Sequence, residues 1–143
     1  MKALFIALCP IVVAACGGPP NTPFIGTWTD NASETETCPS GNHVTPGSGN
    51  VTIVAGSAPT DFVTQSGNGC SLTWTASGNV GSLKGSQSCS VPGSVGGTWA
   101  ATFTSGTLTL SGRTLTLSDS GSAVYTNGGV QDCTFTQSGT FAH

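Results

Sequence analysis

Thr107–Leu117, with the sequence TLTLSGRTLTL, decides the fold class of this chain. Threonine alternates with leucine on both sides of Gly112-Arg113, and strict alternation of polar and apolar residues is typical of a half-buried β-strand. Two such runs around a two-residue turn with glycine first predict a β-hairpin. We expect the leucines to pair across it, with Leu108 opposite Leu117.

The same alternation continues outward from this hairpin. It is clearest in Cys70–Ala76 (CSLTWTA) and Cys133–Phe141. The apolar residues occupy odd-numbered positions in Trp99–Thr104 and even-numbered positions in the first arm of the hairpin. A bulge or turn at Gly106 is therefore needed to keep both apolar sets in the core. The remaining predicted strands cover residues 24–29 (which 30–37 could extend to Cys38), 51–55, 62–65, 80–83 and 87–91. The predicted loops and turns cover residues 39–50, 66–69, 77–79, 92–97 and 127–129.

These elements amount to about eight to ten short strands joined by tight turns. No helical period follows the first residues of the chain. The sequence therefore predicts an all-β fold, a single antiparallel meander that closes as a small barrel or sandwich, and closure would remove the exposed strand edges.

Met1–Cys16 (MKALFIALCPIVVAAC) has the features of a secretory signal: a basic residue, a short apolar run and small residues at its end. Val13-Ala14-Ala15-Cys16 resembles the lipobox of bacterial lipoproteins. That resemblance implies cleavage before Cys16, lipidation of its sulfur and acylation of the new amino terminus. We therefore divide the chain into a lipoprotein signal peptide (1–15), a lipidated cysteine with a tether (16–23) and a β domain (24–143).

The same resemblance predicts the location of the protein. Lipid chains on Cys16 would anchor it to a membrane of the bacterial cell envelope. Gly17 follows the cysteine where an aspartate would favour the inner membrane, so we expect an outer membrane lipoprotein. Gly17–Pro23 (GGPPNTP) is rich in breakers and would reach at most ~25 Å, which keeps the domain close to the membrane.

Charged residues are unusually rare. They make up 6% of the chain, against about 25% in a typical globular domain. The formal net charge is −3, and phosphate binding requires clustered lysine or arginine. We therefore expect no nucleic-acid partner, and a surface built from serine, threonine, asparagine and glycine.

The cysteines that follow Cys16 are even in number and would lie in an oxidising compartment, so two disulfides are expected. Cys38 opposite Cys133 would place the apolar sets of the first and last strands on one side and close the barrel. The turn at 77–79 brings its second arm back towards Cys89, which favours the pair Cys70–Cys89. Close pairs such as Cys-x-x-Cys are absent from the sequence, which argues against a metal site.

Catalytic or cofactor-binding motifs are not evident, and we expect no enzyme activity, no cofactor and no metal. His43 and His143 are expected to be exposed and idle. Strict strand parity would direct Asp30, Glu34 and Glu36 inwards, where paired carboxylates can perform acid/base chemistry. We instead expect the strand to fray or bulge after Asp30, with both glutamates in solvent. Solvated positions at strand ends or turns are also expected for the remaining acidic residues, Asp61, Asp119 and Asp132.

Gly26-Thr27-Trp28 resembles the opening strand of lipocalin-like barrels, in which the tryptophan closes the bottom of the barrel. The arginine that packs on this tryptophan from the final strand of that family is not evident here. The resemblance implies a binding or interaction module for a small apolar ligand or an envelope protein. Two alternatives are a structural, Ser/Thr-rich surface coat without a ligand and a carboxylate-dependent enzyme. An internal cavity of ~300 Å³ or more with a mouth would favour ligand binding.

Overall fold

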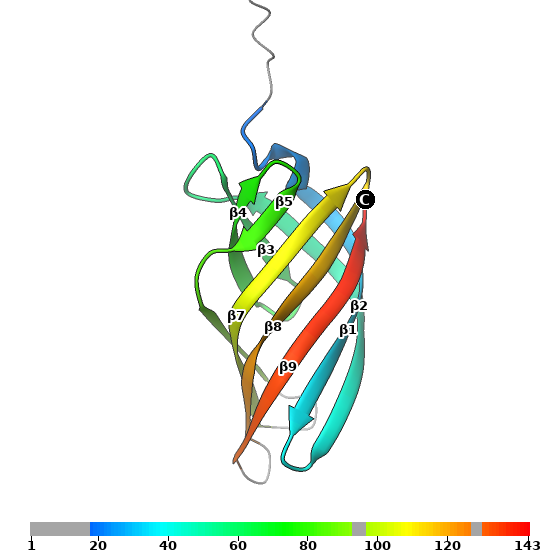
Figure 1. The fold of residues 1–143 in the computed structure, drawn as a ribbon, viewed down its shortest axis with the longest axis vertical. Helices are drawn as coiled ribbons and strands as arrows, with labels where there is room; N and C mark the ends of the chain where they lie inside the picture. Colours follow the sequence, from blue (N-terminus) through cyan, green and yellow to red (C-terminus); the bar gives the residue numbers. More distant parts are fainter. Residues whose placement is uncertain (1–17, 93–96, 127–129) are drawn as a thin grey trace, which may run out of the picture.

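The computed structural model describes residues 18–92, 97–126 and 130–143, and it is all-β apart from one short 3₁₀ turn (Figure 1). The leader, Cys16 and the turn at 127–129 lie outside the described residues, as does most of the loop at 92–97. The elements are η1 (Thr22–Phe24), β1 (Gly26–Cys38), β2 (Gly41–Ala55), β3 (Asp61–Ser66), β4 (Ser71–Ser77), β5 (Val80–Leu83), β6 (Gln87–Pro92), β7 (Thr98–Ser111), β8 (Thr114–Thr126) and β9 (Val130–Ala142).

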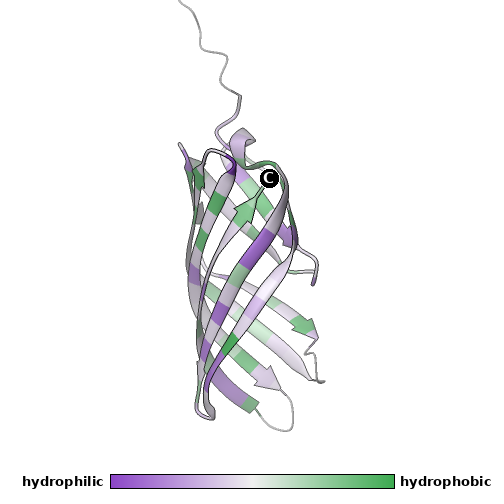
Figure 2. Ribbon diagram, turned by 90° about the vertical axis from the view of Figure 1, so that its right-hand side faces the viewer, coloured by the Kyte–Doolittle hydropathy of each residue, from purple (hydrophilic) through white to green (hydrophobic). Residues whose placement is uncertain are grey.

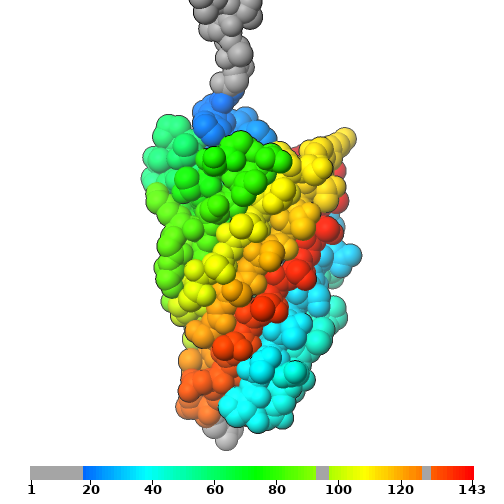
Figure 3. Space-filling view, viewed as in Figure 1, coloured from blue at the N-terminus to red at the C-terminus, as the bar shows by residue number. Residues whose placement is uncertain are grey.

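The strands form one antiparallel nine-stranded sheet that closes in a ring. Their order is β5-β4-β3-β2-β1-β9-β8-β7-β6, and β5 also pairs with β7. On the face shown in Figure 3 the long strands pack side by side as continuous diagonal bands. This arrangement confirms the predicted antiparallel meander and its closure.

The Thr107–Leu117 hairpin forms as predicted. Leu108 pairs with Leu117, and the turn begins at Gly112, whose φ of 61° suits glycine. The predicted change of parity also occurs, but the register shift lies between Phe103 and Ser105, just before the predicted position at Gly106. This bulge joins Trp99–Thr104 and the first arm of the hairpin into the single strand β7, and it keeps both apolar sets inside.

The first and last strands close the ring through the predicted register. Thr37 pairs with Thr134, one position before the disulfide between Cys38 and Cys133, whose Cα atoms are 4.3 Å apart. The second predicted disulfide, Cys70–Cys89, is also present, with Cα atoms 5.6 Å apart. Both pairings inferred from strand parity are therefore confirmed.

The predicted loop at 39–50 is wrong, because Gly41–Asn50 forms the first ten residues of β2. Its composition of glycine, proline, serine and asparagine favours a loop. Each residue nevertheless pairs with β1, from Cys38 opposite Gly41 to Thr29 opposite Asn50. Pairing with a long neighbouring strand therefore overrides the local preference.

A seam runs between β4 and β6. β5 and β6 follow one another along the same edge of β7, but within the described residues β6 has no strand ladder to β4. The Gln87 side chain bridges the seam by donating to the Thr73 carbonyl at 2.6 Å and accepting from the Thr73 amide at 2.8 Å. The Cys70–Cys89 disulfide spans the same seam, so side chains replace the missing backbone pairing.

One end of the barrel is closed by η1 and an aromatic stack, at the top of Figure 1. The buried Phe24 ring stacks on Phe62 with centroids 4.6 Å apart, and Phe62 stacks on Trp74. Asn21 is buried and its amide donates to the Asp61 carbonyl at 2.6 Å. The predicted tether over 16–23 and the strand start at residue 24 are therefore wrong in part, since the last tether residues and Phe24 belong to the folded domain.

Asp61 is buried at this closed end, which corrects its predicted solvated position. The Lys84 ammonium pairs with its carboxylate, and the Thr75 hydroxyl donates to it at 3.2 Å. The hydrogen bond from Lys84 holds the pKa of Asp61 below its usual range. A buried carboxylate is thus compensated by a cation and a hydroxyl.

Trp28 from the Gly-x-Trp element is buried at the same end, and its indole donates to the Phe24 carbonyl at 2.9 Å. The ring of the exposed His143 packs edge-on against it, with centroids 5.0 Å apart. His143 is therefore exposed, as expected, and its ring contacts the indole just after the end of the final strand. The wider likeness to lipocalin-like barrels stays a prediction.

Hydrophobic and hydrophilic positions alternate along the strands, as Figure 2 shows. The inward positions near the closed end form one core, which includes Trp28, Ile53, Phe62, Leu108 and Leu115. Among the described residues there is no helix long and apolar enough to cross a membrane.

Candidate functional site

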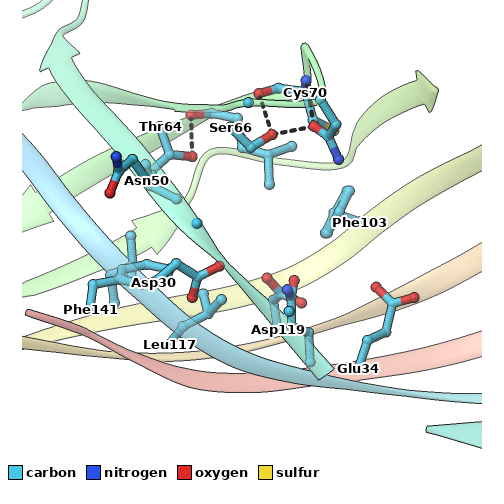
Figure 4. Close-up of a pocket in the computed structure, with 18 of the residues that line it drawn as sticks. Asp30, Glu34, Asn50, Thr64, Ser66, Cys70, Phe103, Leu117, Asp119 and Phe141 are labelled. Carbon is cyan, nitrogen blue, oxygen red and sulfur yellow. Dashed lines mark hydrogen bonds between the residues drawn. The ribbon is translucent and has the colours of Figure 1, made fainter. Parts of the chain in front are cut away.

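Below the closed end, the interior of the barrel contains a cavity of about 450 Å³. Its walls come from β1, β2, β7, β8 and β9 on one side and from β3, β4 and the turn between them on the other (Figure 4). Within the described residues, Gly41–Asn50 of β2 pair only with β1, so the ring is incomplete here. The interior is therefore open to solvent beside β2 and beneath the β3–β4 turn.

Two glycines of β2 help to create this space. Gly47 and Gly49 share the inward parity of Val51 and line the cavity. A Cβ built on Gly49 would meet no atom within 4 Å, and one built on Gly47 would meet only the Ala32 carbonyl, at 3.9 Å. A Cβ at either position therefore has free space, and we expect a larger side chain there to extend into the cavity.

Asp30 and Glu34 point into the cavity from β1 (Figure 4). β1 runs without a break to Cys38 because both of its edges are paired, one with β2 and the other with β9. The expected fray or bulge after Asp30 is therefore wrong, and strict parity holds. Glu34 and Glu36 are half-buried on the inner face and do not extend into solvent.

Asp119 enters the same cavity from β8, and its predicted solvated position is also wrong, since it is only 5% exposed. Its cross-strand neighbours are Gln137 on β9 and Gly106 on β7. A Cβ on Gly106 would lie 3.1 Å from the Asp119 Cβ and 3.0 Å from the Trp74 ring. The glycine therefore leaves room for the carboxyl group and the indole to lie side by side.

The environment raises the pKa of all three cavity carboxyls. Burial is the main cause for Glu34, followed by repulsion from Glu36, and together they raise its pKa to about 7. Burial and then repulsion from Glu34 raise the pKa of Asp119 to about 7. Burial alone raises the pKa of Asp30. Near neutral pH Glu34 and Asp119 are therefore partly protonated.

The remaining wall is largely apolar and aromatic. The Trp99 indole donates to the Glu36 carboxylate at 2.8 Å, which fixes both side chains at the lower edge of the cavity. The other apolar lining residues are Val51, Leu72, Trp74, Phe103, Leu108, Leu117 and Phe141. A molecule in the cavity would therefore meet carboxyl groups and flat apolar surfaces together.

The β3–β4 turn covers one side of the mouth and is internally bonded. The Ser66 hydroxyl donates to the Cys70 carbonyl at 3.1 Å, and the Cys70 amide donates to the Asn68 side chain at 3.0 Å. The Cys70–Cys89 disulfide then fastens the turn to β6. Of the two predicted disulfides, this one therefore borders the cavity.

A second hollow of about 430 Å³ lies beside the Cys38–Cys133 disulfide, with His43 and Tyr125 in its wall. His43 is exposed, as expected from the sequence. Within residues 18–92, 97–126 and 130–143, no three His, Cys, Asp or Glu side chains converge as metal ligands. The first cavity is lined by Asp30 and Asp119, each of which has a buried carboxyl oxygen without a hydrogen-bond partner within the described residues, and it is the better candidate for function.

The fold and the cavity together define a class of protein: a disulfide-linked, antiparallel β-barrel-like domain with an acidic and aromatic internal site. Comparison with protein-family models, curated proteins and solved structures finds no match for the chain.

Proposed function

We propose that this protein is a lipid-anchored binding module of the bacterial envelope that holds a small molecule inside its barrel. The observation that carries the proposal is the cavity of about 450 Å³ with a mouth, a size within the usual range of ligand pockets. A purely structural coat protein has no need of such a space, because filling it with side chains would add stability. An envelope protein that contacts the mouth remains the second type of partner for this module.

The anchor is supported by Val13-Ala14-Ala15-Cys16, with lipid chains on Cys16 as the contact with the outer membrane. Asn21 is the first buried residue of the described chain, and the five peptide links from Cys16 to Asn21 reach at most about 18 Å. The closed end of the barrel, which η1 covers, therefore faces the membrane in this proposal. Palmitate labelling and fractionation test the anchor: Cys16→Ser should lose the label and leave the membrane fraction, and retention of both would contradict it.

Ligand binding can be tested with the uncharged fluorophore N-phenyl-1-naphthylamine, whose emission rises in apolar sites. Gly49→Phe would place a ring in the open space of the cavity, whereas Thr52→Phe would place one on the exposed face of the same strand. We expect saturable binding to the wild type and Thr52→Phe, with at least tenfold weaker binding to Gly49→Phe. Equal binding to all three proteins would show that the fluorophore lies elsewhere and would refute the cavity as the site.

The half-buried Glu34 with its raised pKa is the specific observation that favours an enzyme as the second candidate. Acid/base catalysis by two carboxyls works best when their surroundings drive the two pKa values apart. Here the pKa values of Glu34 and Asp119 are both raised to about 7, so the surroundings do not drive the two values apart. Binding without chemistry is therefore the better-supported function.

A further inference from the structure

The polar side chains of the cavity form a row across three neighbouring strands. Glu34 on β1 pairs with Gln137 on β9, which pairs with Asp119 on β8. Neighbouring strands are about 4.8 Å apart, so the two outer residues of the row are separated by about twice that distance at the backbone. Asp30 lies nearer the closed end on the same face of β1, opposite Phe141. The three carboxyls thus approach a shared space from two strands (Figure 4).

Two of these carboxyls lack a partner. Oδ1 of Asp119 and Oδ1 of Asp30 are both buried, and neither makes a hydrogen bond within the described part of the chain. Among the described residues, the side chains that line the cavity include no lysine, arginine or histidine. Lys84, which could supply a charge, is already paired with Asp61 at the closed end. A buried carboxylate without a counter-charge is costly, so a proton or a bound cation must neutralise it.

The rest of the lining indicates which kind of cation would fit. Trp74, Trp99 and Phe103 contribute aromatic surface to the cavity. Aromatic faces attract organic ammonium groups and also bury the apolar part of such a molecule. The carboxyls are spread over the wall and do not converge as metal ligands within the described residues, which suits an organic cation that spans several groups.

We propose that the cavity binds a small organic ammonium ion, with its charged nitrogen held by Asp119 and Glu34 and its apolar body against the aromatic wall. This inference rests on the proposed function and specifies the ligand class. No covalent step is involved. On binding, the ammonium nitrogen takes the place of the protons that neutralise the carboxyls in the empty cavity.

Proton displacement makes the binding depend on pH. The groups that face Asp119 and Glu34 in the cavity are the acidic Asp30 from β1 and the neutral Gln137 from β9, and Glu36 of β1 acts on Glu34 from outside the cavity lining. An aliphatic amine stays protonated from pH 6 to 8, whereas the two carboxyls, with pKa values of about 7, lose their protons over this range. We expect affinity for the amine to rise about tenfold between pH 6 and 8 for one displaced proton, and about a hundredfold for two.

The test compares 4-phenylbutylamine with the uncharged 4-phenylbutan-1-ol by isothermal titration calorimetry on the full chain. The amine should bind at least tenfold more tightly than the alcohol at pH 8, and this preference should shrink at pH 6. Asp119→Asn and Glu34→Gln should each reduce the preference without weakening the alcohol. Asp132→Asn, which removes an exposed charge from β9, should leave the preference unchanged.

The outcomes separate this inference from the function on which it rests. Equal binding of amine and alcohol at pH 8, with loss of both in Gly49→Phe, would overturn the cation preference and leave the binding cavity intact. Amine binding that survives both carboxyl variants would also overturn it. If the amine, the alcohol and N-phenyl-1-naphthylamine all fail to bind, both the inference and the proposed function are wrong.

Discussion

The buried carboxyl of Asp119 should make the stability of the barrel depend on pH, and Asp119→Asn should remove the part of that dependence that Asp119 contributes. Burial and the nearby Glu34 raise its pKa from the ordinary value of 3.8 to about 7. The folded state therefore binds a proton that the unfolded state has lost between about pH 4 and 7. In this window the free energy of unfolding of the wild type falls as pH rises, and the contribution becomes constant above pH 7.

The size of the effect follows from the shift. One pKa unit corresponds to about 1.4 kcal/mol of free energy, so the raised pKa of Asp119 lowers the free energy of unfolding at high pH by at most about 4 kcal/mol. We expect a loss of about 2 kcal/mol, because the cavity is open to water. Asparagine has nearly the same shape and no charge. Asp119→Asn should therefore match the wild type near pH 3.5 and exceed it by about 2 kcal/mol at pH 8.

Urea denaturation followed by tryptophan fluorescence at pH 4, 6 and 8 measures this difference. A gain of about 2 kcal/mol would raise the midpoint at pH 8 by about 1 M urea. Asp132→Asn is the matched control, because Asp132 is exposed on β9 and its replacement should change little at any pH. If the difference in unfolding free energy between Asp119→Asn and the wild type is the same at every pH, or if Asp119→Asn is the less stable protein at pH 8, then the reasoning that Asp119 is a buried carboxylate without compensation is refuted.

Gly139→Ala should lower the free energy of unfolding by about 1–3 kcal/mol through overpacking, because the new Cβ would lie 2.6 Å from the Ala32 Cβ. Urea denaturation measures this loss, and an unchanged stability would contradict the close contact between the strands. Phe62→Ala should cost about 3–5 kcal/mol in the same assay, since this fully buried ring lies in the aromatic stack. Lys84→Met removes the hydrogen bond that lowers the pKa of Asp61. The stability that the Lys84–Asp61 pair contributes is present above the ordinary pKa of aspartate and is lost as pH falls through the lowered value. The loss of unfolding free energy in Lys84→Met should therefore be greatest at neutral pH. A loss that is independent of pH would argue against the ion pair.

Strand parity predicted the parts of the fold in which one face is apolar. The register of a strand is fixed when a one-residue slip would expose its apolar set. This reasoning placed Leu108 opposite Leu117 and Cys38 next to Cys133, and it required the bulge that appears between Phe103 and Ser105. Long-range closure could therefore be inferred without any homologous structure.

Parity failed to predict β2 because its first half has no apolar face. Gly41–Asn50 contains the residue types of a loop, and its strand conformation depends on β1, which supplies a complete paired edge. The inward glycines Gly47 and Gly49 leave a space in the barrel, and a space produces no pattern in a sequence. The cavity could therefore be found only once the strands were assembled.

The inward carboxyls were misjudged for a related reason. Strand parity predicted an inward Glu34. An unpaired carboxylate in a packed core is energetically costly, so a frayed strand with Glu34 in solvent was the favoured interpretation. The interior at this level is a cavity open to solvent at one side. A strand can therefore stay regular and still present an acid to the inside.

The distribution of charge supports a binding role for these acids. The chain has six acidic residues, and all except Asp132 are buried or half-buried, so its surface depends very little on charge for solubility. Asp61 is compensated by Lys84, whereas Asp119 costs the folded state stability without a counter-charge within the described residues. Side chains that lower stability and do not aid solubility are typical of sites where function opposes stability. A ligand that brings its own positive charge would supply the missing compensation.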